Sequence, residues 1–83
     1  MRYEVIIPLR IQRAILKLDK KIKDRILDKL LELEENPQLG KHLIGIPYWS
    51  LRVGKYRIIY EIEQNKLKIY IINIGHRKEV YRF

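Results

Sequence analysis

The first half of the chain shows a short β pattern followed by two helical ones. Residues 2–7 alternate well enough for a strand, which Pro8 ends because proline has no N–H for a sheet hydrogen bond. Apolar residues at i, i+3, i+4 and i+7 predict a helix over about residues 9–18. A second helix is expected from an Asp19 N-cap to Asn36-Pro37, where Asn accepts the left-handed conformation and Pro cannot continue. The expected buried positions are Ile11, Ala14, Ile15, Leu18, Ile22, Ile26, Leu27, Leu30 and Leu33.

The second half predicts two consecutive β-hairpins. Two runs of β-branched and aromatic residues flank Gly54-Lys55, and a glycine at the first position of a two-residue loop fits a type II′ turn. With Gln64-Asn65 as the second loop, Glu63 faces Lys66 and Glu61 faces Lys68. We therefore expect an α+β fold in a single domain of residues 1–83, with an N-terminal strand, an antiparallel helical hairpin and a three-stranded antiparallel β-meander.

This register gives the sheet an apolar face and an open face. Arg52 and Arg57 lie directly opposite each other on the open face, where like charges cost up to about 1 kcal/mol. A bound anion would explain the pair, although solvated arginines, or arginines paired with carboxylates, are the ordinary alternative. The same parity places Ser50, Ile59, Tyr70, Ile72, Ile74 and His76 on the open face, and Gly75 permits a bulge that turns Arg77 towards it.

The charge of the chain is positive and unevenly distributed. The 83 residues carry a net charge of +8, most of it in the second half. Such a footprint favours a polyanion such as nucleic acid, and plain solubility is the alternative. Cysteine is absent, which excludes disulfides and makes the cytoplasm the default location. No apolar run is long enough to span a bilayer, so no membrane partner is expected, and the use of Ile, Lys and Glu suits a thermophile.

The sequence lacks several enzyme signatures. It has no Gly-rich phosphate loop, no cluster of metal ligands and no nucleophile elbow, so we expect no metal and no cofactor. Arginine, lysine, tyrosine and one histidine suit metal-free phosphodiester chemistry on RNA, in which the 2′-OH is the nucleophile and guanidiniums neutralise the developing charge. We assign no chemistry to the charges of the two helices, nor to His42 in the loop of residues 37–48.

Two stretches carry a resemblance to a known family. Residues 51–60, LRVGKYRIIY, and residues 74–81, IGHRKEVY, together with the order of elements, resemble the RelE/ParE toxin superfamily, and its RelE side most closely. The resemblance covers essentially the whole chain. It implies a small basic toxin that enters the ribosomal A site, cleaves mRNA there, and is silenced by a cognate RelB-like antitoxin.

The resemblance also implies roles for single residues. Arg57 corresponds to the strand arginine that stabilises the scissile phosphate, and Arg77 to the arginine implicated in charge stabilisation and leaving-group protonation. Tyr81 corresponds to the C-terminal tyrosine that stacks on or orients the substrate, and Arg52 to a basic strand position. Ser50 stands where some RelE proteins have a lysine, so we propose His76 as a candidate general base, with simple hydrogen bonding at the strand end as its alternative. The expected contacts to RNA or ribosome are Lys55, Lys78, Arg82, Ser50 and Tyr70.

Two other functions remain open. A ParE-like inhibitor of DNA gyrase would share the fold without nuclease chemistry, and a non-catalytic RNA-binding domain would need only the basic surface. An apolar strip of Ile59, Tyr70 and Ile72 on the open face is expected to lie under the antitoxin.

Overall fold

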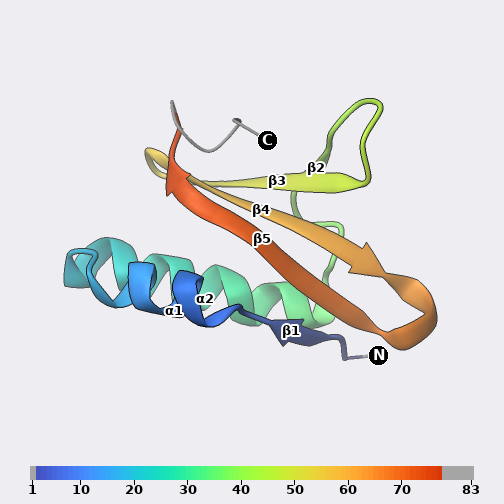
Figure 1. The fold of residues 1–83 in the computed structure, drawn as a ribbon, viewed down its shortest axis with the longest axis horizontal. Helices are drawn as coiled ribbons and strands as arrows, with labels where there is room; N and C mark the ends of the chain where they lie inside the picture. Colours follow the sequence, from blue (N-terminus) through green and yellow to red (C-terminus); the bar gives the residue numbers. More distant parts are fainter. Residues whose placement is uncertain (1, 78–83) are drawn as a thin grey trace.

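The computed structural model describes residues 2–77 as two layers, a mixed sheet and a pair of helices that cover one of its faces (Figure 1). The sheet has five strands in the order β1-β5-β4-β3-β2, with β1 parallel to β5 and every other pair antiparallel. The α+β class and the meander are confirmed, while the two-residue β2 and the pairing of β1 were not predicted. The elements are β1 (Glu4–Ile6), α1 (Leu9–Leu16), α2 (Lys20–Glu35), β2 (Lys41–His42), β3 (Tyr48–Val53), β4 (Tyr56–Glu63), the 3-10 turn η1 (Gln64–Lys66) and β5 (Lys68–His76).

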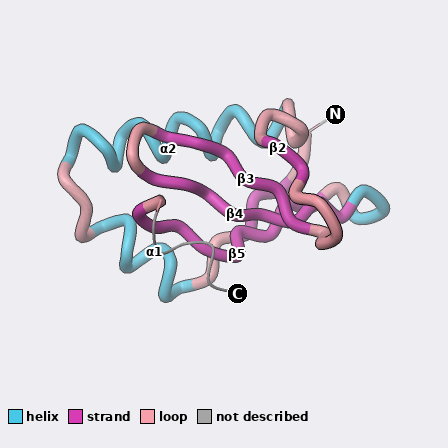
Figure 2. The backbone as a smooth tube through the Cα atoms, turned by 90° about the horizontal axis from the view of Figure 1, so that it is seen from above, coloured by secondary structure: helices cyan, strands magenta, loops and turns pink. Residues whose placement is uncertain are grey.

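The helices form where expected, with differences at their ends. Helix α1 stops at Leu16, and the side chain of Asp19 makes no capping hydrogen bond to α2. Asn36 follows α2 with φ −132°, so the left-handed conformation predicted there is wrong. Ala14 and Leu27, which were expected in the core, are exposed. Helices α1 and α2 lie side by side in one layer (Figure 2), and Leu27 lines an open groove there with Ile15 and Leu16 of α1.

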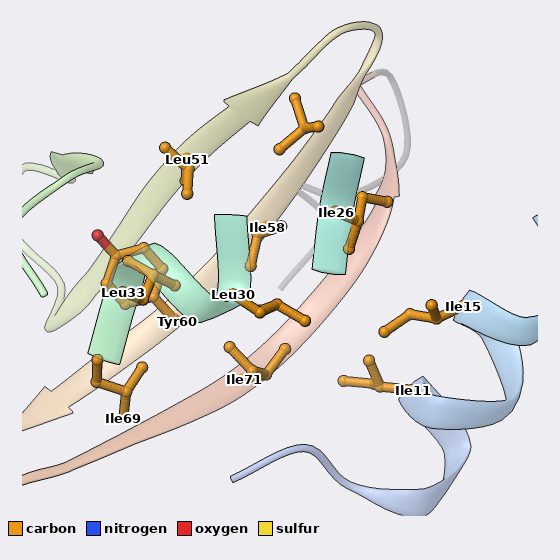
Figure 3. Close-up of a cluster of buried hydrophobic side chains, with 11 residues drawn as sticks. Ile11, Ile15, Ile26, Leu30, Leu33, Leu51, Ile58, Tyr60, Ile69 and Ile71 are labelled. Atoms are coloured by element: carbon orange, nitrogen blue, oxygen red, sulfur yellow. The ribbon is translucent and has the colours of Figure 1, made fainter. Parts of the chain in front are cut away.

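The core lies between the helices and one face of β3, β4 and β5 (Figure 3). The predicted apolar face of the sheet is confirmed as the one that packs on the helices. Burying side chains of this size contributes about 1.5–3 kcal/mol each. The buried cluster comprises Ile11, Ile15, Ile26, Leu30, Leu33, Leu51, Val53, Ile58, Tyr60, Ile69 and Ile71, and Trp49 packs against it.

Tyr60 fastens the loop after α2 to this core. Its hydroxyl donates to the carbonyl of Pro37 at 2.8 Å and accepts from the N–H of Gly40 at 2.9 Å. A Cβ on Gly40 would lie 2.7 Å from the carbonyl oxygen of Ser50, so only glycine fits this approach. The loop is thereby held against β3, and its residues Lys41 and His42 add the short strand β2.

The first hairpin has the predicted register, and the second does not. Gly54 turns the chain with φ +61°, and Arg52 pairs with Arg57. At the second connection, η1 and a left-handed Leu67 (φ 53°) occupy the turn, so Glu63 pairs with Lys68 instead of Lys66. This shift by two residues leaves the parity of the sheet unchanged.

A β-bulge then changes the parity of β5. Tyr60 pairs with Ile71 and Ile59 with Asn73, so Ile72 has no partner in β4. Without the bulge Asn73 would face Ile58 in the core, where an amide without partners is costly. With it, Ile74 takes that place and joins the core, and the Oδ1 of Asn73 accepts the N–H of Ile74 at 3.0 Å.

The bulge overturns part of the expected open face. Ile74 pairs with Ile58 and His76 with Tyr56, both residues of the helix-facing side. The prediction that Ile74 and His76 share a face with the arginines is therefore wrong. Ile59 is fully buried, so it is not available for the exposed apolar strip that was expected beneath the antitoxin.

Candidate functional site

The two arginines of the first hairpin form the centre of the candidate site. Arg52 and Arg57 are directly opposite each other on β3 and β4, on the sheet face turned away from the helices. Arg52 is exposed, and its Nε donates to the carbonyl of Gly54 at 3.3 Å. Arg57 is half-buried, with its Nε shielded from solvent. The turn thus holds the guanidinium of Arg52, and the Nε end of the Arg57 guanidinium is buried.

The end of β5 brings further groups to this hairpin. Gly75 pairs with Arg57, and the backbone N–H of Arg77 donates to the carbonyl of Lys55 at 3.0 Å. These pairings gather Arg52, Arg57, Lys55 and Arg77 at one end of the sheet. A concentration of guanidinium and ammonium groups of this kind attracts phosphate.

His76 lies beside this cluster but on the other side of the sheet. Its ring meets that of Tyr56 edge-on, with the ring centroids 5.8 Å apart. The imidazole is exposed at the strand end. To reach a phosphate held by the arginines, His76 must leave this contact and turn around the end of β5.

The remaining predicted site residues are not all gathered here. Tyr70 pairs with Glu61 and Ile6, five residues along β5 from Gly75, or about 16 Å at the strand repeat. Ser50 is buried, with 4% of its surface exposed, between its partners in β2 and β4. Lys78, Tyr81 and Arg82 lie outside the described residues.

Two side chains of α2 that were not among the predicted site residues also reach this end of the molecule. Lys21 and Arg25 lie one helical turn apart and line a cavity against the β3–β4 turn. The only sequence feature that could have indicated these two residues is their i, i+4 spacing, which places them on one face of the helix. Most charged helix faces share this spacing, so it does not identify a site.

His42 also has a role that its position in a loop did not suggest. Its ring stacks on Trp49, with the ring centroids 4.7 Å apart and the planes 7° apart. Trp49 stacks in turn near Tyr60. This contact fixes β2 against β3 and is structural.

The other chemical possibilities are limited within residues 2–77. There, no three side chains from His, Asp and Glu come together as they would to hold a metal ion. Burial raises the pKa of Tyr60, and the hydrogen bond from Gly40 partly offsets this; the phenol lies on the core side, away from the arginines. In the same part of the chain, neither helix has the length and apolar character needed to cross a membrane.

The sequence of the chain matches a known protein family and a known relative. Residues 7–81 match the family described as the ParE toxin of the type II toxin–antitoxin system parDE. The mRNA interferase toxin RelE of Escherichia coli is 31% identical over 71 residues, which cover 78% of this chain and 75% of that protein.

Solved structures resemble the chain along most of its length. A chain of the RelBE2 toxin–antitoxin complex from Mycobacterium tuberculosis superposes with a TM-score of 0.82 and 26% identity, covering 93% of this chain and 100% of that one. A chain of the archaeal RelE–RelB complex from Pyrococcus horikoshii gives the same TM-score of 0.82 and 26% identity, covering 96% and 100%.

Proposed function

The chain belongs to the RelE/ParE toxin superfamily as a RelE-like toxin of a toxin–antitoxin system, and from this premise we propose that it is a ribosome-dependent endoribonuclease that cleaves mRNA in the A site. The observation that carries the proposal is the pairing of Arg52 with Arg57, next to Arg77, on one end of the open face. The name mRNA interferase, borne by the similar Escherichia coli toxin, agrees with it. The site of action would be the cytoplasm, where ribosomes translate.

The arginines suit the charge changes of RNA cleavage. In the proposed reaction, the 2′-oxygen attacks the adjacent phosphorus and the bond to the 5′-oxygen breaks, leaving a 2′,3′-cyclic phosphate and a 5′-hydroxyl. Arg57, with its Nε shielded from solvent, would hold the phosphate as negative charge builds on it. Arg52 would hold the strand from across the hairpin, and Arg77 would stabilise the departing oxygen. Guanidiniums suit these tasks because they remain charged throughout.

Two protons must also move: one leaves the 2′-OH, and one from solvent water would reach the departing 5′-oxygen beside Arg77. We propose His76 as the group that takes the proton from the 2′-OH, since histidine is the side chain that ordinarily exchanges a proton near neutral pH. This role requires the imidazole to leave Tyr56, as described above. Tyr81 would orient the substrate, in line with the family, and no metal ion would take part.

The proposed partners are a RelB-like antitoxin, the ribosome and mRNA. The M. tuberculosis and P. horikoshii structures are toxin–antitoxin complexes, which supports the first of these. The helical layer has exposed apolar residues suited to such a partner: Leu27 is 42% and Leu31 62% exposed. Leu27 and Ile7 line two adjoining grooves, of about 260 Å³ and 290 Å³, and Leu31 lines the second of them.

The test is to add the purified protein to a translation reaction and to map the 5′ ends of the mRNA. We expect new ends within codons at the A site for the wild type, and almost none for Arg57→Ala. The matched family carries the name ParE toxin, so the ParE-like alternative, inhibition of DNA gyrase, is tested alongside. Inhibition of gyrase supercoiling by both the wild type and Arg57→Ala, with no mRNA cleavage by either, would replace our proposal with that one.

A further inference from the structure

A cavity of about 360 Å³ lies between the start of α2 and the β3–β4 turn, at the same end of the molecule as the arginine pair. Figure 1 shows the α1–α2 connection and the β3–β4 turn together at that end, and Figure 2 shows the same from above. Lys21 and Arg25 line the cavity from the helix, and Lys55 and Tyr56 line it from the hairpin. Its volume falls within the range of small-ligand pockets.

The charge in this cavity is not balanced. Three cations, Lys21, Arg25 and Lys55, line it together with one carboxylate, that of Asp19. Within residues 2–77, none of the three cations forms an ion pair; the recorded pairs involve Arg2, Lys29 and Lys66. Cations gathered in a cavity repel one another, and an anion bound among them removes that repulsion.

The turn is shaped so that the helix cation can approach it. Nη1 of Arg25 would be only 3.2 Å from a Cβ on Gly54, so the guanidinium lies directly against the glycine that makes the turn. Gly54 therefore allows both the positive φ of +61° and the close approach of Arg25. This contact places the exposed guanidinium of Arg25 beside the turn, where its N–H donors can reach a phosphate in the cavity.

The cavity and the arginine pair are on opposite faces of one hairpin. Arg52 and Arg57 face away from the helices, while Lys21 and Arg25 approach from the helix side. Lys55 lies at the tip between them, and its carbonyl accepts the N–H of Arg77. Cations therefore continue around the end of the sheet from one face to the other.

We propose that this cavity is a second phosphate subsite, which binds a phosphodiester group of RNA outside the bond that is cut. Lys21 and Arg25 would contact the phosphate oxygens, with Tyr56 as the wall for the attached sugar or base. The inference rests on the proposed function, because it takes RNA as the ligand. The phosphate could belong to the mRNA strand or to ribosomal RNA, and the two arms of the experiment distinguish these sources.

The test compares two double variants that lose the same charge. Lys21→Ala/Arg25→Ala empties the cavity of its helix cations, and Lys66→Ala/Lys68→Ala removes two cations at the opposite end of the sheet. Binding is measured across a salt series with a short RNA strand carrying 2′-O-methyl groups, which cannot be cut, and separately with ribosomes that hold no mRNA. Thermal midpoints establish that each variant is folded.

We expect the cavity variant to bind about ten-fold more weakly in at least one arm, with the slope of log Kd against log salt reduced by about 1. The control variant should change binding much less, and Asp19→Asn should tighten it. A loss with the RNA strand identifies mRNA as the source, and a loss with ribosomes alone identifies ribosomal RNA. Equal effects of the two double variants in both arms, or no effect of either, would overturn the subsite.

Two further results keep the test decisive. If the double variant does not fold, Lys21→Ala alone and Asp19→Asn must shift binding in opposite directions, and failure to do so overturns the subsite. Wild-type cleavage on programmed ribosomes is measured alongside. If the wild type cleaves mRNA but the cavity variant binds as well as the control variant, the subsite alone is rejected. If the cavity variant binds more weakly but the wild type does not cleave mRNA, the nuclease proposal alone is rejected.

Discussion

At the scale of single residues, Arg57 is the side chain on which the proposed activity depends most. Arg57→Ala is expected to slow mRNA cleavage on programmed ribosomes by about 10²–10³-fold, the typical cost of removing one charge-stabilising donor. Arg57→Lys keeps the charge but loses the planar fork, so it should recover only part of the rate. Single-turnover cleavage measures both, with Lys68→Ala as the control. Near wild-type rates for Arg57→Ala would remove the basis of the nuclease proposal.

His76 can be tested by the pH dependence of the same reaction. If the imidazole takes the proton of the 2′-OH, His76→Ala should lower the rate and flatten the acidic limb of the pH–rate profile. Tyr56→Leu, which removes the ring that His76 contacts, should leave that limb in place. An unchanged profile in His76→Ala would assign the proton transfer to another group.

Tyr60 illustrates a residue whose chemistry is structural. Tyr60→Phe leaves the Gly40 N–H and the Pro37 carbonyl without their partner, which should cost about 1–3 kcal/mol of unfolding free energy at neutral pH. Burial raises the pKa of this phenol in the folded state above its ordinary value of 10.0. The stabilisation is therefore complete below that value and is lost as the pH rises through the folded pKa.

The measurement is urea unfolding of the wild type and Tyr60→Phe across a pH series. The difference between the two proteins should shrink above about pH 10, because only the wild type loses stability as Tyr60 ionises. Tyr70→Phe, in which the hydroxyl of a half-exposed residue is removed, is the control. A difference that stays constant through this range would contradict the burial of the phenol.

At the scale of elements, the bulge in β5 links the core to the site. The Oδ1 of Asn73 accepts the N–H of Ile74, and this local bond supports the change of parity that places Gly75 opposite Arg57. Asn73→Ala should lower the unfolding free energy by about 0.5–1.5 kcal/mol. It should also reduce cleavage at temperatures where the variant is fully folded. Asn65→Ala, in the exposed η1 turn, is the control. If Asn73→Ala and Asn65→Ala lose activity equally, the bulge has no specific role in function.

The same elements show what the sequence can and cannot predict. The first hairpin and its arginine pair follow from local information, because Gly54 permits the positive φ of a two-residue turn and a loop of that length fixes the register of the two runs beside it. The second register depends on Leu67 adopting φ 53°, a conformation that a leucine rarely takes, so charge pairing across Gln64-Asn65 gave the wrong answer. The pairing of β1 with β5 joins segments more than sixty residues apart, which no local pattern encodes.

The site could be predicted to the extent that it depends on the first hairpin. Arg52 and Arg57 need only that register, and the structure places them as expected. His76 lies beyond the bulge, so its face depends on whether Asn73 or Ile74 enters the core, a question of packing. Arg25 reaches the turn only because α2 packs across the sheet, and nothing in its own neighbourhood in the sequence indicates this.

At the scale of the whole molecule, the two layers separate the proposed functions. The cations proposed to hold RNA lie on the open face and at the turn end, while the exposed apolar grooves lie in the helical layer. Leu27→Asp/Leu31→Asp should weaken binding to the cognate RelB-like antitoxin by more than ten-fold, since it places charges on an apolar surface. Cleavage should persist. Ile44→Asp, at a residue that is 99% exposed on a loop, is the control, and equal binding by both variants would place the antitoxin elsewhere.

The arginine site lacks a general base on its own side of the sheet, and we therefore predict that the isolated protein barely cleaves free RNA. Arg52 and Arg57 can hold a phosphate, but His76 faces the other side of the sheet, so the geometry for in-line attack must come from the ribosome. A misplacement of only about 1 Å can cost 10²-fold in rate, and free RNA should therefore be cut at least that much more slowly than mRNA on ribosomes.

Comparing the wild type with Arg57→Ala on both substrates makes this test specific. A contaminating nuclease would degrade free RNA equally in both preparations, whereas cleavage by this chain would depend on Arg57. We expect a large difference between the two proteins on programmed ribosomes and almost none on free RNA. If the wild type degrades free RNA efficiently and Arg57→Ala does not, the protein orients its substrate without the ribosome. In that case the imidazole of His76, or a group that replaces it, must already reach the open face.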